Sequence, residues 1–96
     1  MSKYGKCNEP EDYLTLTEEE KAIVSMWICN RIEPETKKLK PEQRRNSYGL
    51  KHRLERETGL YVTNGQFKGG MKEAGYKAFD VDWINWTYEI RIKREK

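Results

Sequence analysis

One stretch of the chain, residues 47–76, limits most strongly how this sequence can fold. Its residues are SYGLKHRLERETGLYVTNGQFKGGMKEAGY. Glycine adopts the left-handed backbone conformation without a steric penalty, and it therefore often marks the end of a helix. Gly59 and Gly75 predict the ends of two helices, and serine, threonine or asparagine, which favour helix N-termini, stand where each helix should begin. We expect a helix-turn-helix-like unit with a slightly long turn.

The two helices of this unit are expected over residues 47–58 and 64–74. In the second helix, Phe67, Met71 and Ala74 recur at positions i, i+4 and i+7, which predicts the side that faces the core. The opposite side then carries two glycines and two lysines: Gly65, Lys68, Gly69 and Lys72. Either this side is exposed and lets a phosphate backbone, a groove or another protein approach closely, or its glycines pack against a neighbouring element.

A further helix is expected upstream, from Thr17 to about Ile32. Thr17 and Glu20 have the spacing of a capping box, and Pro34 prevents the helix from continuing. The apolar residues of this helix cover more than one stripe, which is typical of a central core helix or of a helix in a dimer interface. Cys29 lies among them and is expected to be a small buried hydrophobe.

The remaining segments complete an α+β fold. Residues 85–93 alternate between polar and apolar side chains, which is the period of a half-buried strand, so we expect a C-terminal β-hairpin packed on the helices. Residues 1–13 and 94–96 are polar and predict a flexible tail at each end of a single winged-helix-like domain over residues 14–93. The expected core residues are Trp27, Leu50, Leu54, Phe67, Met71, Trp86, Tyr88 and Ile90.

Charge is unevenly distributed along the 96 residues, although the net charge is only +3. Residues 8–35 contain eight acidic and two basic side chains, a net charge of −6. Residues 36–56 contain eight basic and two acidic side chains, a net charge of +6. The two halves either pair with each other or present a basic face to an anionic partner.

Known catalytic motifs are missing from the sequence, which lacks a P-loop, GxGxxG, HExxH, GxSxG and a zinc-type cysteine cluster. We therefore expect a non-enzymatic protein without a cofactor or a metal. His52 is the single histidine and is expected to be a packing or surface residue. Cys7 and Cys29 lack CxxC spacing and are expected to be free thiols. No apolar run is long enough to span a membrane and no signal segment is evident, so a cytoplasmic location is expected.

Two binding hypotheses follow, and both use the same surface. In the first, the second helix of the unit inserts into nucleic acid, with duplex DNA as the favoured ligand, and the hairpin acts as a wing. Binding would be salt-sensitive and weakly sequence-selective, because few side chains of that helix can pair with base edges. In the second, the surface docks on another protein. The candidate binding residues are Arg44, Arg45, Arg53, Arg56, Asn64, Gln66, Lys68, Lys72, Arg91 and Lys93.

Three segments, SYGLKH, GLYVTNGQFKGGMKEAGYK and NWTYEIRI, resemble a family of small proteins carried by phages and integrated mobile elements of Gram-positive bacteria. The resemblance covers residues 47–92, and the layout is also similar, more loosely, to winged-helix domains of phage and plasmid replication proteins. It implies a gene-regulatory, host-takeover or counter-defence setting in a bacterial host cell, with anti-CRISPR-type inhibition of a host nuclease complex as one form. It implies no catalytic residues.

Overall fold

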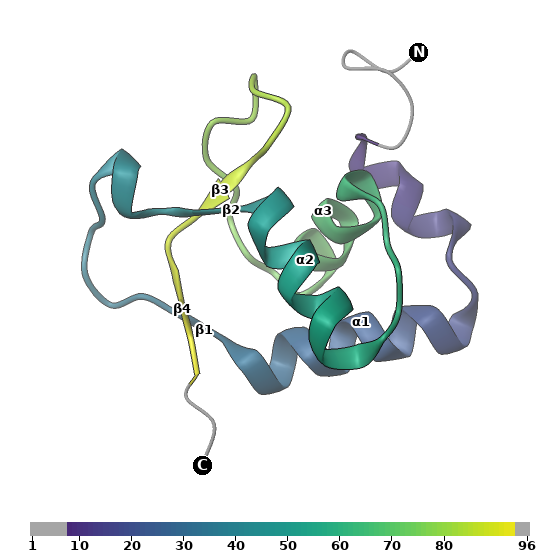
Figure 1. The fold of residues 1–96 in the computed structure, drawn as a ribbon. Helices are drawn as coiled ribbons and strands as arrows, with labels where there is room; N and C mark the ends of the chain where they lie inside the picture. Colours follow the sequence, from purple (N-terminus) through teal and green to yellow (C-terminus); the bar gives the residue numbers. More distant parts are fainter. Residues whose placement is uncertain (1–7, 94–96) are drawn as a thin grey trace.

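The computed structural model describes residues 8–93 and has the predicted α+β fold (Figure 1). Three α-helices are combined with a C-terminal hairpin, two short strands and two 3₁₀ helices. In chain order the elements are η1 Pro10–Thr15, α1 Glu18–Arg31, β1 Ile32–Pro34, η2 Pro41–Gln43, β2 Arg45–Asn46, α2 Ser47–Thr58, α3 Asn64–Glu73, β3 Thr87–Tyr88 and β4 Ile90–Ile92.

The ends of the α-helices follow from local side-chain chemistry. Thr17, Asn46 and Thr63 are the N-caps of α1, α2 and α3, and each side chain accepts a hydrogen bond from a backbone N–H of the first turn. Gly59 and Gly75 follow α2 and α3 with φ angles of 78° and 88°, which is the left-handed conformation. The predicted boundaries of all three helices are therefore confirmed.

The core lies where the three helices and the C-terminal segment meet. Trp27 of α1 packs edge-on against Phe67 of α3, with ring centroids 6.2 Å apart. Of the eight predicted core residues, seven are buried, and Trp86 is half-buried against them. The buried set also includes Tyr13 and Leu16, which join the core from the N-terminal side.

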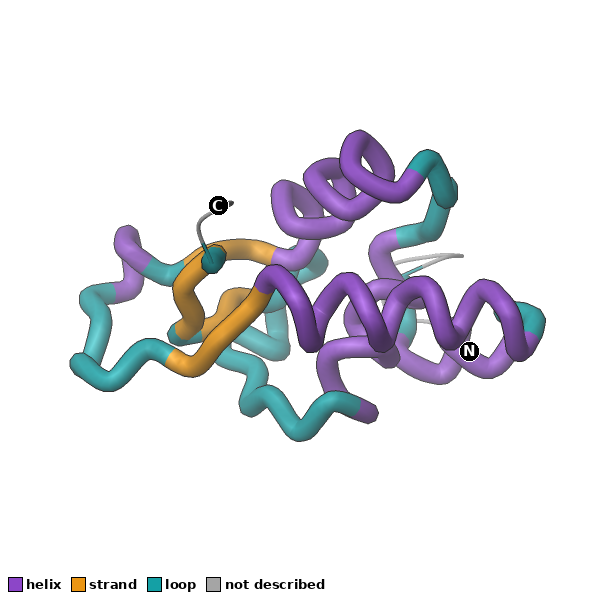
Figure 2. Tube along the Cα trace, turned by 90° about the horizontal axis from the view of Figure 1, so that it is seen from below, coloured by secondary structure: helices purple, strands orange, loops and turns teal. Residues whose placement is uncertain are grey.

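The C-terminal segment doubles back as a hairpin, closed by reciprocal backbone hydrogen bonds of 2.8 and 2.9 Å between Phe79 and Thr87. Beyond Phe79 its second arm pairs antiparallel with two segments from the middle of the chain. Strand β3 pairs with β2, and β4 pairs with β1, placing Ile92 opposite Ile32. These pairings hold the linker between α1 and α2 as a loop that extends away from the helices (Figures 1 and 2).

The expected N-terminal tail is wrong for the residues that the structure describes. Residues 10–15 form η1, which packs along α3 and buries Tyr13 to 8% exposure. The segment is ordered because its apolar side chains have a partner surface, which no local periodicity could reveal. Residues 1–7 and 94–96, which complete the two predicted tails, lie outside the described part of the chain.

Helix α1 is buried on one side only. Val24, Trp27 and Ile28 face the core, whereas Ile23 and Met26 are 40% and 63% exposed. The predicted burial of Cys29 is wrong: it is an exposed free thiol, because it falls just beside the inward stripe. The homodimer that this helix was expected to support stays a prediction.

None of the helices in residues 8–93 has the length and apolar content required to cross a membrane.

Candidate nucleic-acid interface

The predicted docking face of α3 is covered by the N-terminal segment. Phe67 and Met71 face the core as predicted, whereas Ala74, which follows the last turn, is exposed. On the opposite side Gly65 and Gly69 are buried beneath η1. A Cβ atom at Gly69 would overlap side-chain and backbone atoms of η1. Of the two alternatives left open by the sequence, the glycines therefore pack against a neighbouring element.

Lys68 is buried with them, at 1% exposure, so its predicted role as a surface cation is wrong. Its Nζ donates a 2.7 Å hydrogen bond to the carbonyl oxygen of Asn8 and lies 4.8 Å from the ring centroid of Trp86. Burial lowers the pKa of Lys68, while the nearby carboxylates of Glu9 and Asp12 act in the opposite direction. Lys68 holds the N-terminal segment on α3 and cannot reach a ligand.

The two amides expected to pair with bases are also engaged within the protein. Asn64 is buried, and its Oδ1 accepts a 2.7 Å hydrogen bond from Ser47 Oγ. Gln66 completes the capping box of α3, where its Oε1 accepts from the Thr63 N–H at 2.9 Å and its Nε2 donates to Thr15 Oγ1 at 2.8 Å. Both side chains stabilise the start of α3, so the prediction that α3 is the inserted helix is wrong.

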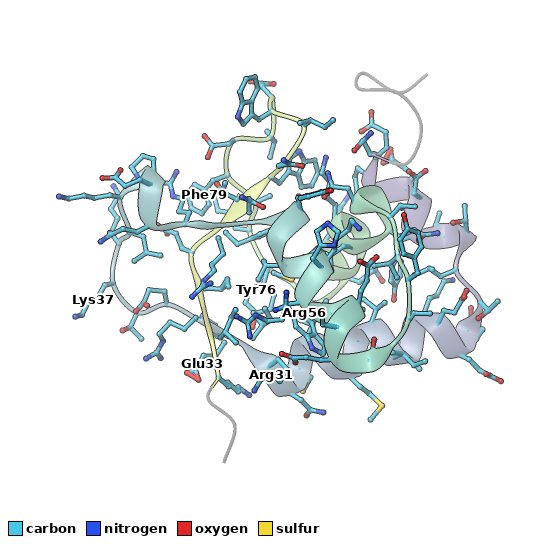
Figure 3. All side chains as sticks on the ribbon, viewed as in Figure 1. Arg31, Glu33, Lys37, Arg56, Tyr76 and Phe79 are labelled. Atoms are coloured by element: carbon cyan, nitrogen blue, oxygen red, sulfur yellow. The ribbon has the colours of Figure 1, made fainter. Side chains whose placement is uncertain are left out.

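On the C-terminal arm, the predicted basic side chains Arg91 and Lys93 are engaged within the protein. Arg91 is half-exposed and pairs with Glu33 at 2.9 Å and with Glu35 at 3.7 Å. Figure 3 labels Glu33 beside the end of β4. Lys93 donates from Nζ to the carbonyl oxygen of Cys29 at 3.0 Å. The charge of Arg91 is therefore compensated by carboxylates, whereas the Lys93 ammonium group is held by a neutral carbonyl group and keeps its charge.

Arg44 likewise has a structural position. Its side chain is 13% exposed and its guanidinium carbon stacks 4.1 Å from the ring centroid of Phe79. Carboxylate oxygens of Asp80 and Glu89 lie 3.9 and 3.8 Å from its nitrogens. Arg44 ties the linker to the hairpin, with the planar stacking for which arginine is suited.

Four of the predicted arginines come together beside α2. Arg44, Arg45, Arg53 and Arg56 line an open cleft of about 260 Å³ whose rim also includes Gly49; we call it the arginine cleft. Among them, Arg44 is the one that stacks on Phe79 and pairs with Asp80 and Glu89. Arg45 and Arg56 are exposed, and within residues 8–93 neither has an ion-pair partner. In the view of Figure 3, Arg56 projects from α2.

Arg53 shares a single carboxylate with other groups. Glu57 accepts from Trp27 Nε1 at 2.8 Å, from Arg31 Nε at 2.9 Å and from Arg53 at 3.5 Å. Burial alone would raise the pKa of Glu57, but the hydrogen bonds from Trp27 and Arg31, the charge of Arg31 and the hydrogen bond from Arg53 lower it. Because one negative charge serves two arginines, the arginine cleft retains a net positive charge.

Gly49 has no packing role inside the protein. A Cβ atom there would meet only Asn46 Oδ1, at an ordinary contact distance of 3.5 Å. The backbone of α2 is thus bare at the rim of the arginine cleft, between Arg45 and Arg53.

A second concavity lies beside the same exposed face of α2. It measures about 460 Å³ and has Tyr48 and Tyr61 in its walls, 51% and 74% exposed, together with His52; we call it the tyrosine pocket. The sequence interpretation did not identify it. The available signal was the spacing of Tyr48, His52 and Arg56, which are four residues apart and form one line along the helix.

Comparisons with known proteins returned no match to a family model, to a curated protein or to a solved structure. The case for a function therefore depends on the chain's own residues. Within residues 8–93, no group of three or more histidine, cysteine, aspartate or glutamate side chains could hold a metal ion. The arginine cleft and the tyrosine pocket both have lining residues from α2.

Proposed function

We propose that the protein is a non-enzymatic nucleic-acid-binding protein that contacts the phosphate backbone through the arginine cleft. The observation that carries this proposal is the cleft itself, where Arg45 and Arg56 point to solvent without an ion-pair partner in the described chain. Arginine presents a planar fork of donors that matches the oxygens of a phosphate group. The bare backbone at Gly49 lets a phosphate approach α2 closely.

The proposal changes which helix meets the ligand. The second helix of the helix-turn-helix-like unit is covered by η1, so α2 supplies the contact surface. The proposed setting is the cytoplasm of a bacterial host cell, in agreement with the resemblance to phage and mobile-element proteins. Binding through arginine and phosphate carries no sequence information by itself, so low sequence selectivity is expected.

The test is fluorescence anisotropy with labelled oligonucleotides over a series of salt concentrations. Neutralising about three phosphates gives a slope of log affinity against log salt of about −2 to −3. Arg45→Gln and Arg56→Gln should each weaken binding and reduce the magnitude of that slope by about one contact. Lys72→Gln, which removes an exposed positive charge on α3, is the matched control and should leave both quantities nearly unchanged.

Two results would contradict the proposal. Absence of binding by the unchanged protein at about 50 mM salt, where phosphate contacts are strongest, would remove nucleic acid as the ligand. Equal losses in Arg56→Gln and Lys72→Gln would show that charge in general, and not the arginine cleft, determines binding.

A second candidate function, docking on a host protein, is favoured by the loop between Phe79 and Thr87. Val81 and Trp83 of this loop are 51% and 69% exposed, and the loop projects from the hairpin (Figure 1). The loop is held by a 2.9 Å hydrogen bond from the Trp83 N–H to the Asp80 carbonyl oxygen and by a 2.7 Å bond from Thr87 Oγ1 to Asp80 Oδ2. Exposed tryptophan on an ordered turn is typical of interface anchors.

Capture from a nuclease-treated bacterial lysate distinguishes this candidate. If protein docking is the function, Trp83→Ala should abolish capture of a specific partner while Arg56→Gln retains it. Identical capture by the unchanged protein and by Trp83→Ala would exclude this loop as the docking site.

A further inference from the structure

We propose that the tyrosine pocket holds an unpaired nucleobase, so that single-stranded nucleic acid is the preferred ligand. This inference rests on the proposed function and names the ligand class of the same surface. The pocket of about 460 Å³ lies within the range of roughly 300–1,000 Å³ found for small-molecule sites. Tyr48 and Tyr61 are exposed in its walls and provide aromatic surface on which a base can stack.

The two rings are held in position before any ligand arrives. Tyr48 makes an edge contact with His52, with ring centroids 4.4 Å apart and planes at 85°. The Lys51 ammonium group lies 5.3 Å from the Tyr48 centroid and 5.1 Å from the Tyr61 centroid. The backbone next to Tyr61 is fixed by Val62, whose side chain is fully buried. These contacts reduce the cost of ordering the two rings on binding.

The charge beneath the rings favours a base over a phosphate. Lys51 is 5% exposed and its Nζ pairs with Glu55 Oε2 at 3.1 Å. Burial alone would raise the pKa of Glu55, but hydrogen bonds from Lys51 and the Val62 N–H and the charges of Lys51 and His52 lower it. The carboxylate therefore stays ionised and compensates the lysine. A neutral, flat and polar group suits such a floor better than an anion.

Asn64 and Asn85 give the pocket a polar part of its lining. Asn64 donates from Nδ2 to Asn85 Oδ1 at 3.0 Å, which turns the amide nitrogen of Asn85 away from Asn64. That nitrogen has no hydrogen-bond partner within residues 8–93. It is available to an acceptor on the edge of a base, as amide side chains commonly are in nucleic-acid recognition.

The tyrosine pocket and the arginine cleft lie on one exposed face of α2. Tyr48, His52 and Arg56 succeed one another at intervals of about one helical turn; the first two line the pocket and the third lines the cleft. A strand whose phosphates contact the arginine cleft can place a base in the pocket only if that base is unpaired and unstacked. A duplex keeps its bases in the helix stack, and this difference predicts the preference for single strands.

The test compares three labelled probes in the anisotropy assay: a twenty-nucleotide oligothymidylate, a duplex of the same length, and a single strand in which several positions are abasic. The unchanged protein should bind oligothymidylate about 10-fold more tightly than the duplex, as expected for the loss of one stacked base. Tyr61→Ala should lose about 10-fold in affinity for oligothymidylate and nothing for the duplex, whereas Tyr61→Phe should keep the affinity. Trp83→Ala, which removes an exposed aromatic ring outside the pocket, is the matched control.

The outcomes separate this inference from the proposed function. If Arg56→Gln weakens binding to every probe while Tyr61→Ala changes none, the pocket does not hold a base and the arginine cleft stands alone. If the duplex binds as tightly as oligothymidylate, the preference for single strands is wrong. The abasic strand tests the inference without a mutation. The unchanged protein should bind the abasic strand about as weakly as the Tyr61→Ala variant binds oligothymidylate. Failure of all three probes to bind would overturn both proposals.

Discussion

Lys68 is a lysine that belongs to the core of this protein. It is 1% exposed, bonded to the carbonyl oxygen of Asn8, and placed near the carboxylates of Glu9 and Asp12. Lysine is seldom fully buried, so the sequence favoured a surface position. What buries it is a segment about sixty positions away in the chain, and no local pattern around Lys68 indicates that contact.

Replacing Lys68 by glutamate is therefore expected to damage the fold. The change would put a third acidic group beside Glu9 and Asp12 in a site closed to water, and we expect a loss of about 3 kcal/mol or more in the free energy of unfolding. Lys72→Glu on the exposed side of α3 should stay within about 0.5 kcal/mol of the unchanged protein. Urea unfolding measures both values, and similar values for the two variants would contradict the burial of Lys68.

Glu57 gives a prediction for acid stability. Because its pKa is lowered in the folded protein, its contribution is complete above the ordinary value of 4.5 and is lost as pH falls through the lower, folded value. Glu57→Gln should lower the free energy of unfolding by about 1 kcal/mol at neutral pH, through the weakened bonds from Trp27 and Arg31. The difference should fade in acid. Glu18→Gln is the control, since the Glu18 side chain is 91% exposed, and this variant should unfold with nearly the same free energy as the unchanged protein. A Glu57→Gln deficit that persists undiminished in acid would show that ionisation of Glu57 is not its cause.

At the scale of elements, the sequence predicted the helices well and the strands poorly. Helix ends are set within one helical turn, by caps such as Thr17 and Thr63 and by glycine stops such as Gly59. They can therefore be recognised from the neighbouring sequence alone. Strands β1 and β2 contain three and two residues and exist because a distant arm pairs with them. The glycines of α3 were recognised as a site of close approach, but the sequence could not tell whether the approaching group was a ligand or the chain itself.

The packing of η1 on α3 predicts opposite effects for two glycine-to-alanine changes. Gly69→Ala would force a methyl group into Tyr13 and the Pro10 carbonyl, and should cost about 1–3 kcal/mol. Gly49→Ala on the open side of α2 has room and should stabilise the protein by about 0.5–1 kcal/mol, because alanine favours a helix. Thermal unfolding compares the two directly. Stabilisation by Gly69→Ala would mean that η1 does not lie on α3.

For the whole molecule, the core is shared by η1, the three α-helices and the C-terminal arm, so no part buries its apolar side chains alone. We expect one cooperative unfolding transition. Urea curves followed by tryptophan fluorescence and by far-ultraviolet circular dichroism should coincide. Trp83→Phe, which removes the exposed tryptophan, should leave the midpoint unchanged. An earlier fluorescence transition would instead show that the hairpin detaches first.

The tertiary structure of the whole molecule explains why the candidate site was only partly predicted. The charge pattern correctly placed basic residues around α2, and Arg45, Arg53 and Arg56 do line one cleft. The sequence could not show that Arg44, which lines the same cleft, and Arg91 are paired with carboxylates, because the acidic partners of those two come from other parts of the fold. Which arginines stay free to bind a ligand is therefore decided by the tertiary structure.

The pairing of β4 with β1 joins residues 90–92 to residues 32–34, and Tyr88 and Ile90 fill the centre of the protein. During synthesis, the helices can form as they leave the ribosome, but the interior cannot close until this late segment has emerged. The nascent chain should therefore expose apolar surface until residues 90–92 have left the ribosome, which makes it a substrate for chaperones over that interval.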